Sequence, residues 1–179
     1  MLKLVHILKQ LNEWVARLAG LALLAGIALI IIEIVLREMG FNFSGSEEIS
    51  GYLMASLSSW GISYALMHRA HVRIDILREK AQKHAAIRSL FDLVAIASVS
   101  FVAIYVATKV VAVVEKSANT GALANTALET PLIIPQSIWL AGWLWFAVLS
   151  TLLLLIGVVL FAQRRFDDVD SLLGIEESH

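Results

Sequence analysis

The sequence lacks cysteine, and only two of its 179 residues are proline. Without cysteine the chain cannot form disulfides, thiolate-ligated metal sites or iron–sulfur clusters. Both prolines, Pro131 and Pro135, lie in one short stretch, so neither interrupts a long apolar segment. Charged residues are also scarce, at 16% of the chain with a net charge of -1. This balance does not indicate nucleic-acid binding, which normally requires a strong excess of basic residues.

The sequence contains four long apolar runs instead. Hydrophobic residues make up 59% of the chain and the mean hydropathy is +0.78, whereas soluble domains are roughly 45–50% apolar. An α-helix rises about 1.5 Å per residue, so about 20 residues cross a hydrocarbon core of roughly 30 Å. We therefore predict a single all-α integral membrane domain with four transmembrane helices, at residues 18–36, 49–67, 90–114 and 133–161.

The basic residues are distributed unevenly among the segments outside these runs. Eleven of the 14 Lys and Arg residues lie in three segments, residues 1–17, 68–89 and 162–179. The other two connections hold only Arg37 and Lys116. Because cytoplasmic segments of membrane proteins carry the Lys and Arg excess, we expect both termini and the central loop to be cytoplasmic. The loop at residues 115–132 is then periplasmic, and the acidic C-terminal tail is expected to be solvated.

Residues 1–17 have the pattern of an amphipathic helix. Apolar residues such as Leu8 and Leu11 share one helical face, whereas polar residues such as Asn12 lie on other faces. We predict an interfacial helix on the inner leaflet, with Trp14 in contact with lipid, that then turns into the first span. The alternative interpretation is a plain cytoplasmic extension of the first span.

Two charged residues within the apolar runs bear on function. Glu33 could serve as the proton-coupled carboxylate of a small stand-alone carrier. We favour a structural role for it at the outer end of the first span, because Arg37 lies one turn away and charges near helix ends escape most of the cost of burial. Lys109 is expected to extend outward, toward the headgroups.

Other classes of membrane chemistry find little support in the sequence. A membrane anchor of a redox complex would hold haem between histidines inside the bundle, but all five histidines lie outside the apolar runs. Transporters usually form substrate sites from interrupted helices, but no proline breaks a predicted span here. We therefore predict no cofactor, no metal ion, no enzymatic activity and no substrate site within this chain.

Small residues recur every four positions along the second predicted span. They are Gly51, Ala55, Ser59 and Ser63. Small side chains let helices approach closely, so this stripe can pack within the bundle or against another membrane subunit, and the sequence does not separate the two uses. At the start of the fourth span, Trp139 and Trp143 are predicted headgroup anchors, with a partner surface as the alternative.

Three short stretches follow one another in a characteristic order. They are EIVLR at residues 33–37 with SEEI at 46–49, HRAHVRID at 68–75, and TPLIIP at 130–135 followed by Trp139. Together they resemble the small membrane subunit, the DctQ-like component, of the tripartite ATP-independent periplasmic (TRAP) transporters. The second stretch departs from the family pattern at Ala70, where glycine is common. The resemblance covers nearly the whole chain in order, length and topology.

This resemblance implies a secondary transporter with three components in the bacterial inner membrane. A periplasmic binding protein would deliver a small organic acid, and a large multispan membrane subunit would carry it together with sodium. The small subunit would brace the large one in a one-to-one complex, while the substrate and sodium sites would belong to the large subunit. The expected partners are therefore these two proteins and membrane lipids.

The residue patterns and the resemblance together give a set of candidate interface or structural residues. They are Arg37, Glu47, Glu48, Gly51, Ala55, Ser59, Ser63, Arg69, His71, Arg73, Asp75, Pro131 and Pro135. Glu47 and Glu48 can pair with Arg37, cap the second span or contact a partner. Asp75 can pair with a nearby arginine at the headgroups, contact the large subunit, or cap a helix at residues 76–89. Pro135 suits the first turn of the last span.

Overall fold

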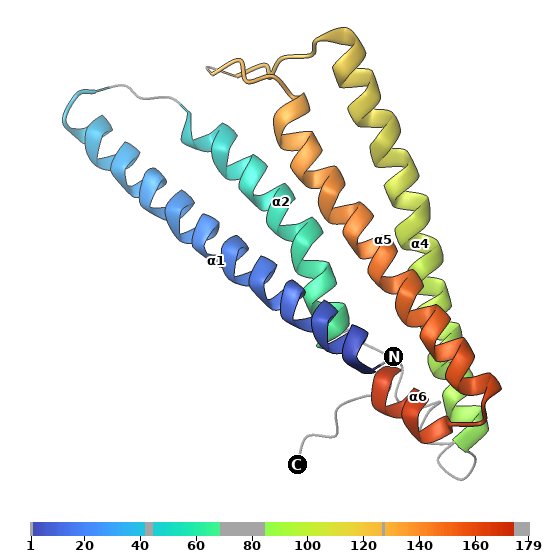
Figure 1. Ribbon diagram of the computed structural model, residues 1–179. Helices are drawn as coiled ribbons and strands as arrows, with labels where there is room; N and C mark the ends of the chain where they lie inside the picture. Colours follow the sequence, from blue (N-terminus) through green and yellow to red (C-terminus); the bar gives the residue numbers. More distant parts are fainter. Residues whose placement is uncertain (1, 42–44, 69–84, 127, 174–179) are drawn as a thin grey trace.

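The computed structural model describes residues 2–41, 45–68, 85–126 and 128–173. The helices in these ranges are α1 (Leu2–Glu38), α2 (Ser46–Met67), α4 (Ala85–Thr120), α5 (Ile133–Ala162) and α6 (Phe166–Leu173) (Figure 1). An isolated β-bridge joins Leu123 and Pro131 in the connection between α4 and α5. The predicted all-α class is therefore confirmed for the described part of the chain.

The four long helices lie side by side in one layer. Their order across the layer is α1, α2, α5, α4, and each helix packs against the next one (Figure 1). We call one end of this layer the loop end, because α1 and α4 end there and α2 and α5 begin there. The opposite end, where α1 begins and α6 packs against α4 and α5, is called the tail end. Because the helices form a layer, α1 and α4 are edge helices.

Three of these helices are long and apolar enough to cross a membrane: residues Val5–Glu38 of α1, and the whole of α4 and α5. α2 is not among them, because serines, glycines and two glutamates occupy many of its positions. It nevertheless lies between α1 and α5 along its length. The structure thus supports three of the four predicted spans by length and composition.

α1 differs from the prediction at its N-terminal part. The helix runs without a break from Leu2 to Glu38, so no turn separates an interfacial helix from the first span. Residues 14–20 lack proline, and most are good helix formers, so nothing in the sequence ends the helix there. Leu8 and Asn12 are buried against the layer, which agrees with the alternative of one extended first helix.

Two helix ends at the loop end are set by glycines with positive φ. Gly40 (φ 86) ends α1, and the N–H of Phe41 then donates to the carbonyl of Leu36 at 2.9 Å. Gly121 (φ 59) ends α4 in the same way. This helix therefore continues to Thr120, beyond the end of the predicted span at residue 114. Both follow the Schellman arrangement, in which a left-handed residue closes the last helical turn.

The main contact in the layer is between α4 and α5. α4 buries residues at every third or fourth position, including Ile96 and Ala103, and these belong to the same buried apolar cluster as Leu149 and Leu153 of α5. Within this contact the hydroxyl groups of Ser100 and Thr151 are hydrogen-bonded at 3.0 Å. Such a bond satisfies two polar groups that lipid could not solvate.

The C-terminal tail was expected to be solvated, and for its first part this expectation is wrong. Residues Phe166–Leu173 form α6, in which Val169 and Leu173 are buried against α4 and α5. These two residues are four positions apart and therefore lie on one helical face, while Asp167 and Asp168 lie elsewhere on the helix. The prediction was wrong because the tail is mostly acidic, and the two apolar residues of this short amphipathic helix contribute little to its overall composition.

Candidate functional site

Polar side chains at the loop end connect α1 to α2. The carboxylate of Glu33 accepts a hydrogen bond of 2.9 Å from the backbone N–H of Ser46, the first residue of α2. The first N–H groups of a helix have no partner within the helix, and a carboxylate there is favourable. Glu33 therefore caps α2 from the neighbouring helix, in agreement with the structural role proposed for it from the sequence.

Glu48 connects α2 to the α4–α5 connection. Its carboxylate accepts hydrogen bonds from the hydroxyl group of Thr126 and, at 2.7 Å, from that of Tyr52. The side chain of Glu48 is buried although it lies close to the end of the layer. Nearby, Leu128 packs closely against Gly45, just before α2. The α4–α5 connection is thus held against the start of α2 by both polar and apolar contacts.

These hydrogen bonds also determine the ionisation of Glu48. The hydroxyl groups of Thr126 and then Thr130 lower the pKa of its carboxyl from 4.5 to about 2, with a further contribution from Tyr52 and an opposing effect of burial. Hydrogen bonds donated to a carboxylate stabilise its charged form. Glu48 is therefore ionised at neutral pH and acts as an acceptor for several donors.

The other candidates at this end have different positions. Glu47 and Arg37 are both exposed, and within the described residues Arg37 forms no ion pair with Glu47 or Glu48. Pro131 forms the β-bridge with Leu123, which closes the α4–α5 connection on itself. Pro135 is buried in the first turn of α5, as predicted. Among the described residues, the side chain of Glu48 has defined internal partners, whereas that of Glu47 is exposed.

The small-residue stripe of α2 divides into two halves. Ser59 and Ser63 are buried, and Ser59 packs against Gly142 of α5. Gly51 and Ala55 are exposed, and no heavy atom lies within 4 Å of the position that a Cβ on Gly51 would take. Half of the stripe is therefore used for packing within the layer, and the other half is exposed among the described residues.

At the tail end of the layer, His68, which follows α2, lies beside Glu13 of α1. The Nε2 atom of His68 lies 4.0 Å from a carboxylate oxygen of Glu13, whose other oxygen lies 3.8 Å from Arg17. The remaining candidates of the central motif, Arg69, His71, Arg73 and Asp75, lie outside the described residues, as does most of the helix predicted at residues 76–89.

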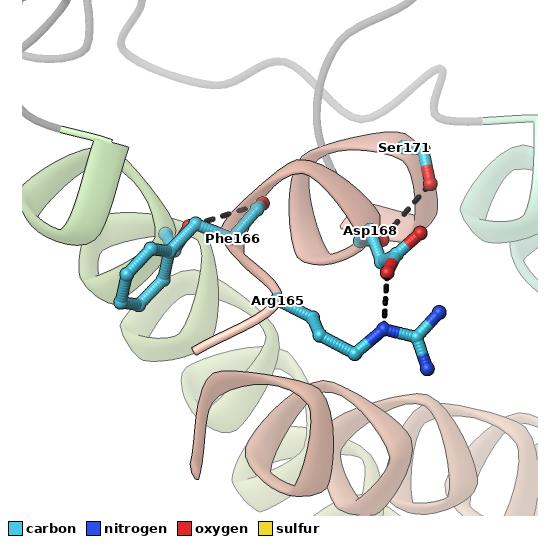
Figure 2. Close-up of polar contacts among 5 residues, drawn as sticks. Arg165, Phe166, Asp168 and Ser171 are labelled. Carbon is cyan, nitrogen blue, oxygen red and sulfur yellow. Dashed lines mark hydrogen bonds and ion pairs between the residues drawn. The ribbon is translucent and has the colours of Figure 1, made fainter. Parts of the chain in front are cut away.

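α6 is held in place by ionic contacts at the tail end. Arg88 of α4 lies 3.1 Å from Asp170. Figure 2 shows the contacts within the segment itself, where the Nε atom of Arg165 donates to Asp168 at 2.5 Å and the hydroxyl group of Ser171 donates to the backbone carbonyl of Asp168. The tail thus begins as a fixed element rather than as a free extension.

The tryptophans differ in their exposure and in their contacts. Trp14 is 62% exposed and its ring lies 5.9 Å from the guanidinium carbon of Arg17, which suits a lipid contact. Trp143 packs edge-on against Phe146 inside the layer, while Trp139 is half-buried. Trp145 donates from its indole N–H to the side chain of Asn12 at 3.2 Å. Trp143 therefore packs within the layer, and only Trp14 is largely exposed.

Several residues of these contacts were not singled out from the sequence. Thr126 and Tyr52 bind Glu48, Arg88 pairs with Asp170, and Asn12 is buried against Trp145. The signal for Tyr52 is its position one turn after Glu48 on the same helix. Thr126 carries no such signal, because its partner is distant in the sequence.

Comparison with protein families identifies the chain. Residues 26–166 match the family described as tripartite ATP-independent periplasmic transporters, DctQ component. The chain belongs to the DctQ family. The matched DctQ region contains α2, α4 and α5 entirely, together with Glu33, Glu48 and Thr126 at the loop end. Comparisons with curated proteins and with solved structures each gave no match.

Membership of the DctQ family confirms the resemblance drawn from the three sequence stretches. DctQ chains are components of TRAP transporters rather than enzymes, so the chain is a small component of such a transporter. The start of α1 (residues 2–25) and most of α6 lie outside the matched region. These two segments contact the rest of the layer through Leu8, Asn12 and Val169.

Proposed function

We propose that this chain is a membrane scaffold that braces the large transport subunit of a TRAP transporter. In this proposal the complex lies in the bacterial inner membrane and imports a small organic acid together with sodium. A periplasmic binding protein delivers the acid, and the substrate and sodium sites belong to the large subunit. The observation that carries the proposal is the DctQ match across residues 26–166.

The described structure supports a bracing role. α1, α4 and α5 are continuous helices, and transport sites are usually built from interrupted ones. Contacts along the layer are either close helix packing, as between Ser59 and Gly142, or hydrogen bonds that fix one element to another, as between Glu33 and Ser46. Such contacts favour one fixed arrangement over two alternating ones.

We further propose that α2 crosses the membrane together with its neighbours. Its length of 22 residues suffices. Both of its neighbours, α1 and α5, are apolar enough to span. Two of its serines, Ser59 and Ser63, are then buried against protein rather than exposed to lipid. With this arrangement both chain termini lie on the cytoplasmic side, where the Lys and Arg excess is found.

The decisive experiment is reconstitution into vesicles with a sodium gradient and the cognate binding protein. The large subunit and this chain together should take up the organic acid, and neither membrane subunit should do so alone. Co-purification of the two membrane subunits gives an independent measure of assembly. Uptake by this chain alone would contradict the scaffold role, and full uptake by the large subunit alone would make the brace unnecessary.

A further inference from the structure

One face of α4 is left uncovered by the part of the chain that the structure describes. We define the free face of α4 as six exposed residues that recur at helical spacing: Val94, Ser98, Phe101, Tyr105, Lys109 and Ala112. The buried residues of α4, such as Ile96 and Ala103, lie on the opposite side of the helix, against α5. Phe101 and Tyr105 are 72% and 56% exposed. Because α4 is an edge helix, no other described helix covers this face.

Lys109 places a positive charge on this largely apolar face, within the predicted span. Its ammonium nitrogen lies 5.3 Å from the centre of the Tyr105 ring, one turn nearer the tail end. The side chain therefore extends toward the middle of the predicted span at residues 90–114, and the expectation that it would extend outward is wrong. Long side chains on a helix tend to point toward its N-terminus, and α4 begins at the tail end.

This position is unfavourable if the free face of α4 meets lipid alone. Lys109 lies about seven residues from the middle of the predicted span, which corresponds to roughly 10 Å along the helix. The hydrocarbon core extends about 15 Å from its centre, so the ammonium group lies within it. A single aromatic ring offsets only part of the cost of placing a charge there.

The membrane segments of this chain offer Lys109 no free carboxylate. Glu33 is the acidic residue within the predicted spans at residues 18–36, 49–67 and 133–161, and it accepts the hydrogen bond from Ser46. In the predicted span at residues 90–114 the acidic residue is Asp92, which lies 17 residues from Lys109 at the tail-end side of the helix. A second copy of α4 packed on this face would therefore bring another lysine rather than an acidic partner.

We propose that the free face of α4 docks onto a transmembrane helix of the large subunit, and that a carboxylate on that helix pairs with Lys109. The proposal rests on the function proposed above and adds the surface and the chemistry of the contact. Phe101 and Tyr105 supply the apolar area around the charge, and aromatic residues commonly form the centre of such contacts. Ser98 and Val94 extend the contact toward the tail end.

The first test replaces the charge. In cells that produce the cognate large subunit, Lys109→Met should reduce the amount of large subunit that co-purifies with this chain by about tenfold, and Lys109→Arg should retain most of it. Lys116→Met is the matched control, because Lys116 is exposed on the same helix beyond the predicted span, and it should leave co-purification unchanged. If the free face of α4 contacted only lipid, Lys109→Met would leave the co-purified amount of large subunit unchanged or increase it.

The outcomes separate this proposal from the proposed function. If the unmodified chain does not co-purify with the large subunit, the proposed function fails. If it does, and Lys109→Met assembles equally well, only the docking surface is wrong. The isolated Lys109→Met chain should melt in detergent at or above the temperature of the unmodified chain, which shows that lost assembly does not reflect misfolding.

The second test identifies what covers the face. A photo-crosslinking amino acid, p-benzoylphenylalanine, placed at Tyr105 should capture the large subunit, as identified by mass spectrometry. The same probe at Val148, which is 51% exposed on α5, is the comparison site. Capture of lipid alone or of a second copy of this chain at Tyr105 would overturn the proposal.

Discussion

Ser59 of α2 packs directly against Gly142 of α5. A Cβ atom added at residue 142 would lie 2.8 Å from the Cβ of Ser59 and 3.1 Å from its backbone carbonyl carbon. Separations this short require the backbones themselves to move apart, because rotating the serine side chain relieves only part of the clash. The contact explains why a serine and a glycine occur where two helices cross inside an apolar layer.

Gly142→Ala should therefore destabilise the chain by about 1–3 kcal/mol, a typical cost of overpacking. Thermal unfolding in detergent measures the change. Gly61→Ala is the matched control, because Gly61 is exposed on α2 with no heavy atom within 4 Å of its Cβ position. Alanine there should be neutral or stabilising, by up to about 1 kcal/mol. Equal effects of the two changes would show that the α2–α5 contact is not tight.

Glu48→Gln should lower the stability at neutral pH and change its dependence on pH. The pKa of Glu48 is lower in the folded chain than its usual 4.5, so its ionised form stabilises the fold above that value. This contribution is lost as the pH falls through about 2. The unmodified chain should lose stability as the pH falls from 4.5 to about 2. Glu48→Gln should lack the part of this loss that comes from protonating Glu48.

The control for Glu48 is its neighbour. Glu47→Gln removes an exposed carboxylate in the same helical turn, and it should leave both the stability at pH 7 and the slope at low pH nearly unchanged. Unfolding in detergent between pH 2 and pH 7 gives both quantities. A larger effect at Glu47 than at Glu48 would contradict the role of the hydrogen bonds from Thr126 and Tyr52.

The sequence predicts the long helices well, because apolar length depends only on composition and spacing. It predicts Glu33 and Pro135 correctly for a similar reason, since helix ends have local requirements. The Glu48–Thr126 bond could not be predicted, because the two residues meet only after α5 has packed beside α2. The division of the small-residue stripe is of the same kind: Gly51 and Ser59 look alike in the sequence, but only Ser59 lies opposite Gly142.

The errors also have physical causes. The continuous α1 is only the alternative interpretation of the sequence, because amphipathic periodicity describes one face of a helix and not its direction relative to a membrane. α6 was missed because the acidic residues around Val169 dominate the composition of the tail. In both segments a few apolar side chains decide the packing, and a charge count does not detect them.

Val169→Ala should loosen α6 from the layer. Val169 is fully buried against α4 and α5, so the smaller side chain leaves a cavity and should cost about 1–2 kcal/mol. Limited proteolysis of the tail should then become several-fold faster. Asp167→Asn, at an exposed position of the same helix, should change the cleavage rate little. Unchanged proteolysis in Val169→Ala would indicate that Arg88 and Asp170 hold α6 without help from the apolar contact.

Arg164→Gly should stabilise the chain. Arg164 follows α5 with a positive φ of 57. The N–H of the next residue, Arg165, donates to the carbonyl of Leu160 at 3.0 Å, as the residues after Gly40 and Gly121 donate back to α1 and α4. For a residue with a side chain, this left-handed conformation costs about 1 kcal/mol of folding free energy, and for glycine it does not. Gln163→Gly is the control, because Gln163 has a φ of -79 and gains nothing from glycine. The melting temperature in detergent should rise for Arg164→Gly, because only this change relieves strain. For Gln163→Gly it should fall or stay the same. The reverse order would show that the turn into α6 does not require a left-handed residue.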